Sequence, residues 1–181
     1  MTRIGIFYGS TDGHTAAVAA RLKQQLDALP AADGSAPGPA TVELLDVAEY
    51  YLEEMQDFDC LILGVPTWNR GQLQADWESV IDEFGELDLR GKPAAVFGLG
   101  DQFGYPDTFA DALFFVADGL RQSGAQLVGR WPTEGYDFRA SWAVEDGQFL
   151  GLVLDEDNQP EQTSARLAAW SRQIAQEFGL T

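Results

Sequence analysis

The stretch IGIFYGSTDGHTAAVAARLKQQL, residues 4–26, decides the fold. Its first five residues form an apolar run, which is typical of a buried strand. Beyond Gly13 the period changes, because Val18, Leu22 and Leu26 recur at steps of four, as on one face of an amphipathic helix. A short polar turn separates the two. A strand that runs directly into a helix is the first half of a βαβ unit, so this stretch predicts a parallel sheet.

The same alternation continues along the rest of the chain. Apolar runs predict further strands at residues 41–45, 59–65, 93–98 and 126–131. Amphipathic patterns predict further helices at residues 77–84, 109–120 and 167–178, and Thr163 or Ser164 is expected to cap the last of them. Residues 30–39 predict a loop. A polar stretch, 132–148, precedes another strand-like run, 149–154. We expect one domain, residues 1–181, of the α/β class, with helices on both faces of a parallel sheet.

The composition is strongly acidic, with 29 Asp and Glu residues against 11 Lys and Arg and a formal net charge of −18. Such a surface repels nucleic acid and anionic membranes and attracts a basic patch on a partner protein. The alternative is that the acidity serves solubility alone. Cys60, the single cysteine, cannot form an internal disulfide and indicates neither a CxxC pair nor a metal cluster. Without a signal-peptide pattern or an apolar run of about 20 residues, we expect a soluble cytoplasmic protein.

The turn after the first strand, GSTDGHT at residues 9–15, carries three hydroxyl side chains and two glycines where a helix begins. Free N–H groups and the positive end of the helix dipole favour a phosphate there. The lysine of a Walker loop is missing, so a nucleoside triphosphate with magnesium is not expected. Taken alone, the segment fits a phosphate site and an ordinary Ser/Thr-rich helix start equally well.

Two aromatic residues follow later strands of the predicted sheet. Trp68 lies in the turn GVPTWNRG at residues 64–71, and Tyr105 lies in GLGDQFGYP at residues 98–106. Ligands of open parallel sheets bind outside the carboxyl ends of the strands, so both rings are expected near the phosphate turn. Trp68 could instead fold back over the domain edge. One phosphate turn and two aromatic walls together indicate a mononucleotide with a large flat ring, which describes FMN.

These segments resemble a flavodoxin of the long-chain type found in bacteria and cyanobacteria. The likeness covers nearly the whole chain and is strongest at residues 9–15, 66–69, 71–78 and 98–105, with further matches at 135–138, 154–159 and 177–180. The resemblance implies a three-layer sandwich around a five-stranded parallel sheet of order 2-1-3-4-5, whose fifth strand is interrupted by the loop 132–148. It also implies non-covalently bound FMN and an electron-transfer protein rather than an enzyme.

The resemblance also implies roles for single residues. The phosphate loop would consist of Ser10, Thr11, Asp12, Gly13, His14 and Thr15. The flavin would lie between Trp68 and Tyr105, with Asn69, Arg70 and Gly71 beside its N5 atom and the backbone of Leu99, Gly100 and Asp101 at its pyrimidine edge. Contacts to the ribityl chain or the ring edge would come from Thr67, Thr108 and Asp157, and Pro66 is also expected to belong to the cofactor site. No residue is predicted to be catalytic or to bind a metal.

Two residues of the expected phosphate loop, Asp12 and His14, differ from those that the family usually has there. Asp12 stands where the family usually has threonine, and its carboxylate would repel a phosphate dianion. We therefore expect Asp12 to point away or to cap the helix. His14, the only histidine, is expected to be an exposed residue at the helix start.

The function that the resemblance implies is low-potential, one-electron transfer between redox proteins. The expected donor is similar to a ferredoxin-NADP reductase, the acceptor is a photosystem, nitrogenase or another reductase, and the protein is expected to be monomeric. An FMN-dependent NAD(P)H:quinone oxidoreductase of the same fold is the alternative, although rings on both sides of the flavin leave no room for its substrate. A phosphorylated signalling module would need an aspartate at residues 65–67, which are Val-Pro-Thr. A flavin-free docking domain stays open.

Overall fold

A twisted parallel sheet is the middle layer of the molecule in the computed structural model, which describes residues 1–30 and 40–181. Its strands are β1 (Thr2–Tyr8), β2 (Ala40–Asp46), β3 (Cys60–Trp68), β5 (Pro93–Leu99), β6 (Gln126–Val128) and β10 (Leu152–Leu154), with β4 (Gln72–Leu73) attached to the end of β3. The helices are α1 (His14–Asp27), α2 (Ala75–Val80), α3 (Ala112–Gln122) and α4 (Thr163–Glu177), with 3₁₀ turns η1 (Leu52–Asp57), η2 (Ile81–Glu86) and η3 (Pro160–Gln162). None of the helices in these described ranges is long and apolar enough to cross a membrane.

The strand order is β10-β5-β3-β1-β2, and β6 also pairs with β5. Pro93 and Ala95 of β5 pair with β6, whereas residues 97–99 of the same strand pair with β10. β6 and β10 are thus two pieces of one fifth strand. The predicted order 2-1-3-4-5 and the interruption of the fifth strand are both confirmed. Between the two pieces the chain forms a small antiparallel sheet of β7 (Trp131–Pro132), β8 (Val144–Glu145) and β9 (Gln148–Phe149).

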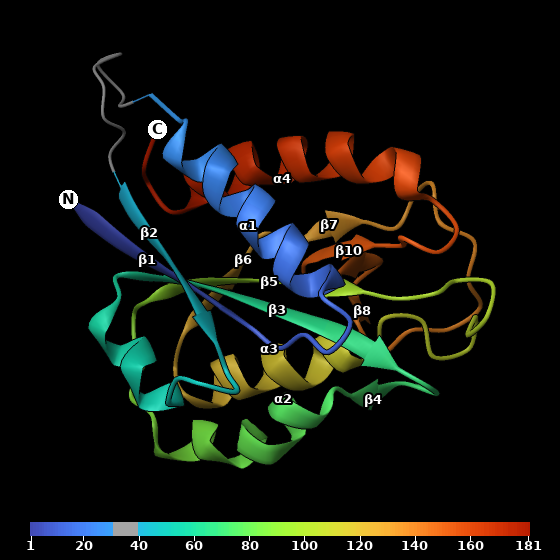
Figure 1. The fold of residues 1–181 in the computed structure, drawn as a ribbon, viewed down its shortest axis with the longest axis horizontal. Helices are drawn as coiled ribbons and strands as arrows, with labels where there is room; N and C mark the ends of the chain where they lie inside the picture. Colours follow the sequence, from blue (N-terminus) through green and yellow to red (C-terminus); the bar gives the residue numbers. More distant parts are fainter. Residues whose placement is uncertain (31–39) are drawn as a thin grey trace.

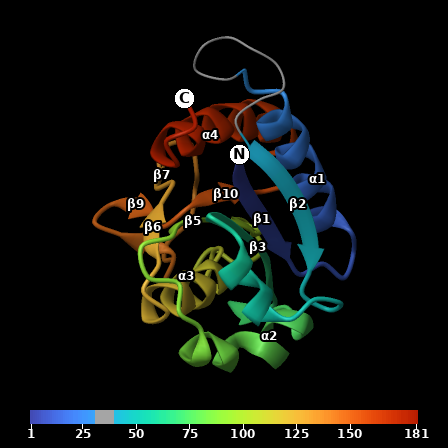
Figure 2. The same ribbon diagram turned by 90° about the vertical axis from the view of Figure 1, so that its left-hand side faces the viewer.

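Helices cover both faces of the sheet, as Figures 1 and 2 show: α1 and α4 lie on one face, and α2 and α3 lie on the other. The alternation of side chains along each strand divides the core accordingly. On β1, Ile4 and Ile6 pack with residues of α1 and α4, whereas Phe7 packs with residues of α2 and α3. All three are fully buried. Burial of one such side chain contributes about 1.5–3 kcal/mol, so both layers are held by apolar contact.

Two of the predicted strands end differently from their sequence pattern. The strand predicted at 126–131 stops at Val128, because Gly129 adopts a left-handed conformation (φ 80°) and its carbonyl accepts a hydrogen bond from Trp170 Nε1 (2.7 Å). Trp131 therefore joins the small antiparallel sheet instead. The strand predicted at 149–154 contributes only β10 to the main sheet. A Cβ atom on Gly151 would lie 1.9 Å from the carbonyl oxygen of Val96, so the chain approaches β5 too closely there for any other residue.

Three helix predictions also need correction. The helix predicted at 77–84 begins at Ala75 and changes to the 3₁₀ turn η2 at Ile81. The helix predicted at 109–120 begins only at Ala112, because Ala110 has a positive φ of 56°. Thr163 is the first residue of α4 and not its cap, and its hydroxyl hydrogen-bonds to the Glu156 carboxylate. Apart from Pro30, the loop predicted at 30–39 lies outside the described residues.

Candidate functional site

A cleft of about 170 Å³ opens at the carboxyl ends of the central strands. It is formed by four segments that are far apart in the sequence: the loop after β1 with the start of α1, the end of β3, the end of β5 with the loop after it, and the loop after β10. Its lining residues are Ser10, Thr11, Asp12, His14, Thr15, Pro66, Thr67, Trp68, Leu99, Gly100, Asp101, Tyr105, Glu156 and Asp157. This is the edge at which an open parallel sheet places its ligands.

The loop from β1 to α1 leaves several hydrogen-bonding groups unused. Gly13 is the N-cap of α1, in a left-handed conformation (φ 84°), and the helix start receives no hydrogen bond from a capping side chain. The buried Oγ of Ser10 has no hydrogen-bond partner among the described residues. Because buried polar groups are normally paired, the Ser10 hydroxyl and the N–H groups of the helix start together fit an anion that completes their hydrogen bonds.

Helix α2 holds this loop in place from behind. Gly9 N–H donates to the Gly64 carbonyl (3.2 Å), which also accepts from Trp77 Nε1 (2.9 Å). Gln74 Nε2 donates to Thr11 Oγ1 (3.2 Å). A Cβ atom on Gly9 would lie 2.3 Å from Gln74 Oε1, so only glycine fits between the loop and α2. The position of the loop therefore depends on side chains more than 60 residues further along the chain.

Trp68 lies half-buried at the end of β3, where a tight turn begins. Trp68 and Gln72 are paired across the β3–β4 hairpin, and residues 69–71 form the turn between them. Asn69 and Gly71 have positive φ angles of 45° and 83°, which asparagine and glycine tolerate best. Asn69 Nδ2 donates to Gln72 Oε1 (3.0 Å) and closes the turn. The hairpin fixes the Trp68 ring against one side of the cleft.

Tyr105 lines the same cleft from the loop after β5 and is 40% exposed. Its N–H donates to the Asp101 carbonyl (2.9 Å). The Asp101 carboxylate accepts hydrogen bonds from Gly104 N–H (2.7 Å), Phe103 N–H (3.2 Å) and Asn158 Nδ2 (2.8 Å). Burial acts to raise the pKa of Asp101, but these hydrogen bonds outweigh it and hold the pKa below its usual value. The ionised side chain thereby fixes the shape of the loop that carries Tyr105.

The charges around the cleft are mainly negative. Its lining includes Asp12, Asp101, Glu156 and Asp157, and His14 is the one basic side chain among the described lining residues. Burial raises the pKa of Asp157, and the neighbouring carboxylates raise it further. An anion at the start of α1 is therefore attracted by N–H groups and the helix dipole, which act like about half a positive charge, and not by a lysine or arginine of the lining.

Most of the residues that the sequence predicted for the site lie together in this cleft. Five do not line it: Gly13, Asn69, Arg70, Gly71 and Thr108. Gly13 contributes the turn into α1, Arg70 and Thr108 line an adjacent hollow with Tyr105, and Gly71 lines a groove that also contacts Trp68. Asp12 was expected to point away or to cap the helix; the cap is wrong, since no side chain caps α1, and Asp12 is among the residues that line the cleft.

Glu156 lines the cleft and was missed by sequence reasoning. Its only signal is its place beside Asp157 in the acidic run of residues 155–157. A run of acids is usually a solvated surface, so the sequence pattern alone gives no reason to assign it. In the structure its carboxylate hydrogen-bonds to the hydroxyl of Thr163, the first residue of α4.

Comparisons with known proteins agree with this geometry. The family model described as flavodoxin matches residues 6–170. A flavodoxin of a Picosynechococcus species is 47% identical over 180 residues, which cover 99% of this chain and 100% of that one. A Synechocystis flavodoxin is 42% identical over 174 residues, 96% of both chains. The crystal structure of a Fusobacterium nucleatum flavodoxin bound to flavin mononucleotide superimposes with a TM-score of 0.88 at 30% identity, over 98% of this chain and 99% of that one. The matched region contains every residue of the cleft.

Proposed function

The chain belongs to the flavodoxin family, and on this basis we propose that it binds one FMN without a covalent bond and carries single electrons between larger redox proteins. The observation that carries the proposal is the unpaired, buried Ser10 hydroxyl beside the uncapped start of α1, in a cleft that Trp68 and Tyr105 also line. A phosphate and a flat aromatic ring on one molecule match these two features together.

Different residues of the cleft bind different parts of the proposed cofactor. Ser10 and the first N–H groups of α1 would hold the phosphate, and Trp68 and Tyr105 would hold the flavin ring. Thr67 Oγ1 accepts a hydrogen bond from Ala112 N–H (3.2 Å), so the Thr67 hydroxyl keeps its own hydrogen for the cofactor. FMN supplies the redox chemistry when it is bound, and the protein binds it, orients it and excludes water from it.

The acidic lining supports a low potential for the proposed carrier. A unit negative charge about 10 Å from another, at an effective dielectric of about 20, disfavours it by about 1.7 kcal/mol before salt screening. For one electron this corresponds to roughly 70 mV. Several carboxylates line the cleft, so each added electron meets a field that opposes it. Arg70 lies outside the cleft lining but adjoins Tyr105, and its positive charge offsets part of this field.

The proposed partners are basic redox proteins. A reductase similar to ferredoxin-NADP reductase is the donor, and a photosystem, nitrogenase or another reductase is the acceptor. The net charge of −18 supports this choice, because it speeds encounters with positively charged surfaces. We further propose that the protein is a cytoplasmic monomer and has no enzymatic activity of its own. The last point is supported by Trp68 and Tyr105, which line the same cleft and would cover the two faces of a bound flavin against a nicotinamide or a quinone.

The test is to titrate the apoprotein with FMN and then to reduce the loaded protein anaerobically with dithionite, following absorbance. We expect uptake of one FMN per chain and reduction in two separate one-electron steps. The loaded protein should oxidise NADPH only slowly when no partner is present. Rapid oxidation of NADPH with a quinone would instead identify a quinone reductase, and failure to take up FMN would leave only a flavin-free docking domain.

A further inference from the structure

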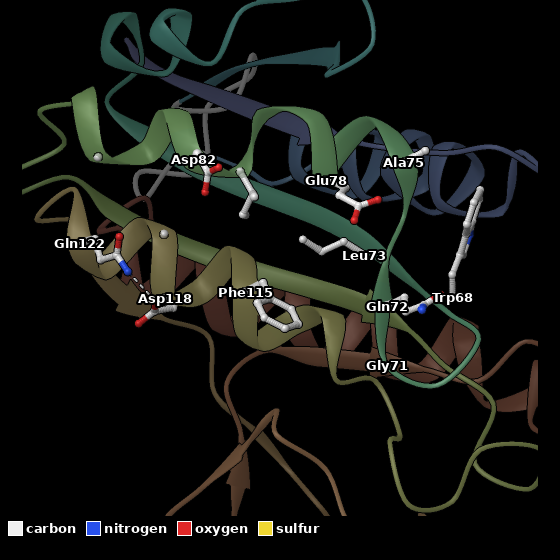
Figure 3. A pocket seen from close by; sticks show the side chains of 13 residues that line it. Trp68, Gly71, Gln72, Leu73, Ala75, Glu78, Asp82, Phe115, Asp118 and Gln122 are labelled. Carbon is white, nitrogen blue, oxygen red and sulfur yellow. Dashed lines mark hydrogen bonds between the residues drawn. The ribbon is translucent and has the colours of Figure 1, made fainter.

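A groove of about 730 Å³ lies on the α2–α3 face of the molecule, outside the cofactor cleft. Figure 3 shows it between α2 with η2 on one side and α3 on the other, with Leu73 and Phe115 directed into it. Ile81 is a further apolar residue of the lining. We call this the α2–α3 groove. It is larger than the cofactor cleft, and the proposed binding of FMN makes no use of it.

The rim of the α2–α3 groove is acidic. Glu78 and Asp82 line it from α2 and η2, and Asp118 lines it from α3, where Gln122 Nε2 donates to its carboxylate (2.6 Å). The part of the lining that the structure describes includes no lysine or arginine. An apolar floor below an acidic rim is complementary to a lysine or arginine side chain, whose aliphatic stem packs on the floor while its charged end pairs at the rim.

An exposed aromatic residue, Trp142, extends the apolar surface next to the groove. Trp142 is 61% exposed and packs its ring against Phe114 and Phe115, with centroids 5.9 Å away in each case. The N–H of Trp142 donates to Asp111 Oδ1 (2.7 Å), so its backbone is anchored to the start of α3. An exposed tryptophan beside a cavity is the type of residue that carries binding energy at protein interfaces.

The α2–α3 groove and the cofactor cleft share a wall, because Trp68 lines both. Gly71, in the turn that follows Trp68, also lines the groove. A chain seated in the groove would therefore contact the same ring that borders the flavin site. This continuity favours a redox partner as the occupant, since electron transfer needs the two redox groups close together.

We propose that the α2–α3 groove and Trp142 are the docking site for a basic, amphipathic segment of a redox partner protein. A lysine or arginine of that segment pairs with Asp82 and Asp118, and an apolar side chain next to it packs on Phe115 and Trp142. The inference rests on the proposed function and adds to it where the partner binds and with which side chains.

The experiment measures binding and electron transfer with a ferredoxin-NADP reductase as the probe, using the FMN-loaded protein at low ionic strength. Asp82→Lys is compared with Glu83→Lys, which makes the same charge change on the adjacent residue of η2 but faces a different hollow. We expect Asp82→Lys to slow reduction by the NADPH-reduced reductase about tenfold and Glu83→Lys to have a much smaller effect.

A second pair of variants tests the apolar half of the site. Trp142→Ala should weaken binding of the reductase by about 30-fold. The control is Tyr51→Ala, which also removes an exposed aromatic residue (73% exposed, at the start of η1) and should leave binding of the reductase unchanged. FMN affinity and thermal unfolding of each variant show that the fold and the cofactor site are intact.

The outcomes separate the groove from the carrier function. Equal effects of Asp82→Lys and Glu83→Lys would overturn the groove proposal, because only overall charge would then matter. The groove proposal would also be overturned if the protein forms dimers and Asp82→Lys disrupts them, because a second copy of the chain would then be what binds in the groove. A protein that takes up FMN and is reduced by dithionite but binds no reductase would overturn the groove proposal and leave the carrier function standing. A protein that takes up no FMN would overturn both.

Discussion

Replacement of Ser10 by alanine should change FMN affinity and apoprotein stability in opposite directions. The Ser10 hydroxyl is buried without a partner among the described residues, and an unpaired buried group of this kind costs about 1–3 kcal/mol. A hydrogen bond from it to a charged phosphate contributes about 1.5–3 kcal/mol. Ser10→Ala removes both, so FMN binding should weaken by about 10- to 100-fold, while the apoprotein becomes more stable by roughly 1 kcal/mol.

The assay is titration of the apoprotein with FMN, followed by the fluorescence of the flavin, with riboflavin as a second ligand. Riboflavin has no phosphate, so its affinity should be nearly the same in Ser10→Ala and the unaltered protein. Ser79→Ala is a matched control, because Ser79 is exposed on α2 and, among the residues that the structure describes, bonds only to the Asp76 carbonyl (2.7 Å). Urea unfolding of the apoprotein measures the change in stability.

Two results would refute the reasoning. Equal losses of affinity for FMN and riboflavin would mean that Ser10 acts on the ring or on the shape of the loop, and not on the phosphate. A less stable Ser10→Ala apoprotein would mean that the hydroxyl is already paired before the cofactor binds. Either result would remove the observation on which the phosphate assignment depends.

Three further substitutions, at Arg70, Glu145 and Asp111, test the effects of single charged side chains on the redox potential and on stability. Arg70→Ile should lower the potential of the second one-electron step by up to roughly 70 mV in a redox titration, and an unchanged or higher potential would exclude a role for this charge. Glu145→Gln should destabilise the protein by roughly 0.5–1 kcal/mol at pH 7 in urea unfolding, because hydrogen bonds from Arg121 and Arg130 lower the pKa of Glu145 to about 2. That loss should disappear as the pH falls from about 4.5 towards 2, where the carboxylate is protonated in the folded state too. Asp111→Asn should stabilise the protein at pH 7, since burial raises the pKa of Asp111 and the folded state disfavours its charge. The gain should vanish at a pH low enough to protonate Asp111 in both states, and a gain that persists there would contradict this account.

The parallel α/β class and the location of the site were predictable from the sequence because both follow from local patterns, whereas the order of the strands was implied only by the resemblance to flavodoxins. Strands buried on both faces appear as continuous apolar runs, such as residues 60–65, and the helices between them keep a regular apolar stripe. Parallel strands joined by helices have their carboxyl ends at one edge, so the polar turns after those ends must converge. No single tertiary contact has to be known for that conclusion.

The rest depends on contacts between distant segments. The true start of α3 follows from the positive φ of Ala110, and the early end of β6 follows from Gly129, which Trp170 holds through a hydrogen bond. Neither is visible in a periodic pattern. The α2–α3 groove arises because η2 packs against α3, and Trp142 stands in a polar stretch where nothing in the sequence shows what it contacts.

The interruption of the fifth strand connects the cofactor cleft with the proposed docking site. The inserted stretch packs Tyr136 and Phe138 around Phe109, and a Cβ atom on Gly100 would lie 2.9 Å from the Phe109 ring. The insertion thus contacts Phe109, which itself lies close to the loop that borders the cleft, and it also places Trp142 against Phe115 beside the groove. A shorter chain with an unbroken fifth strand would lose both supports together. Changes in the inserted stretch should therefore alter FMN affinity and partner binding in parallel, even though most of its residues touch neither.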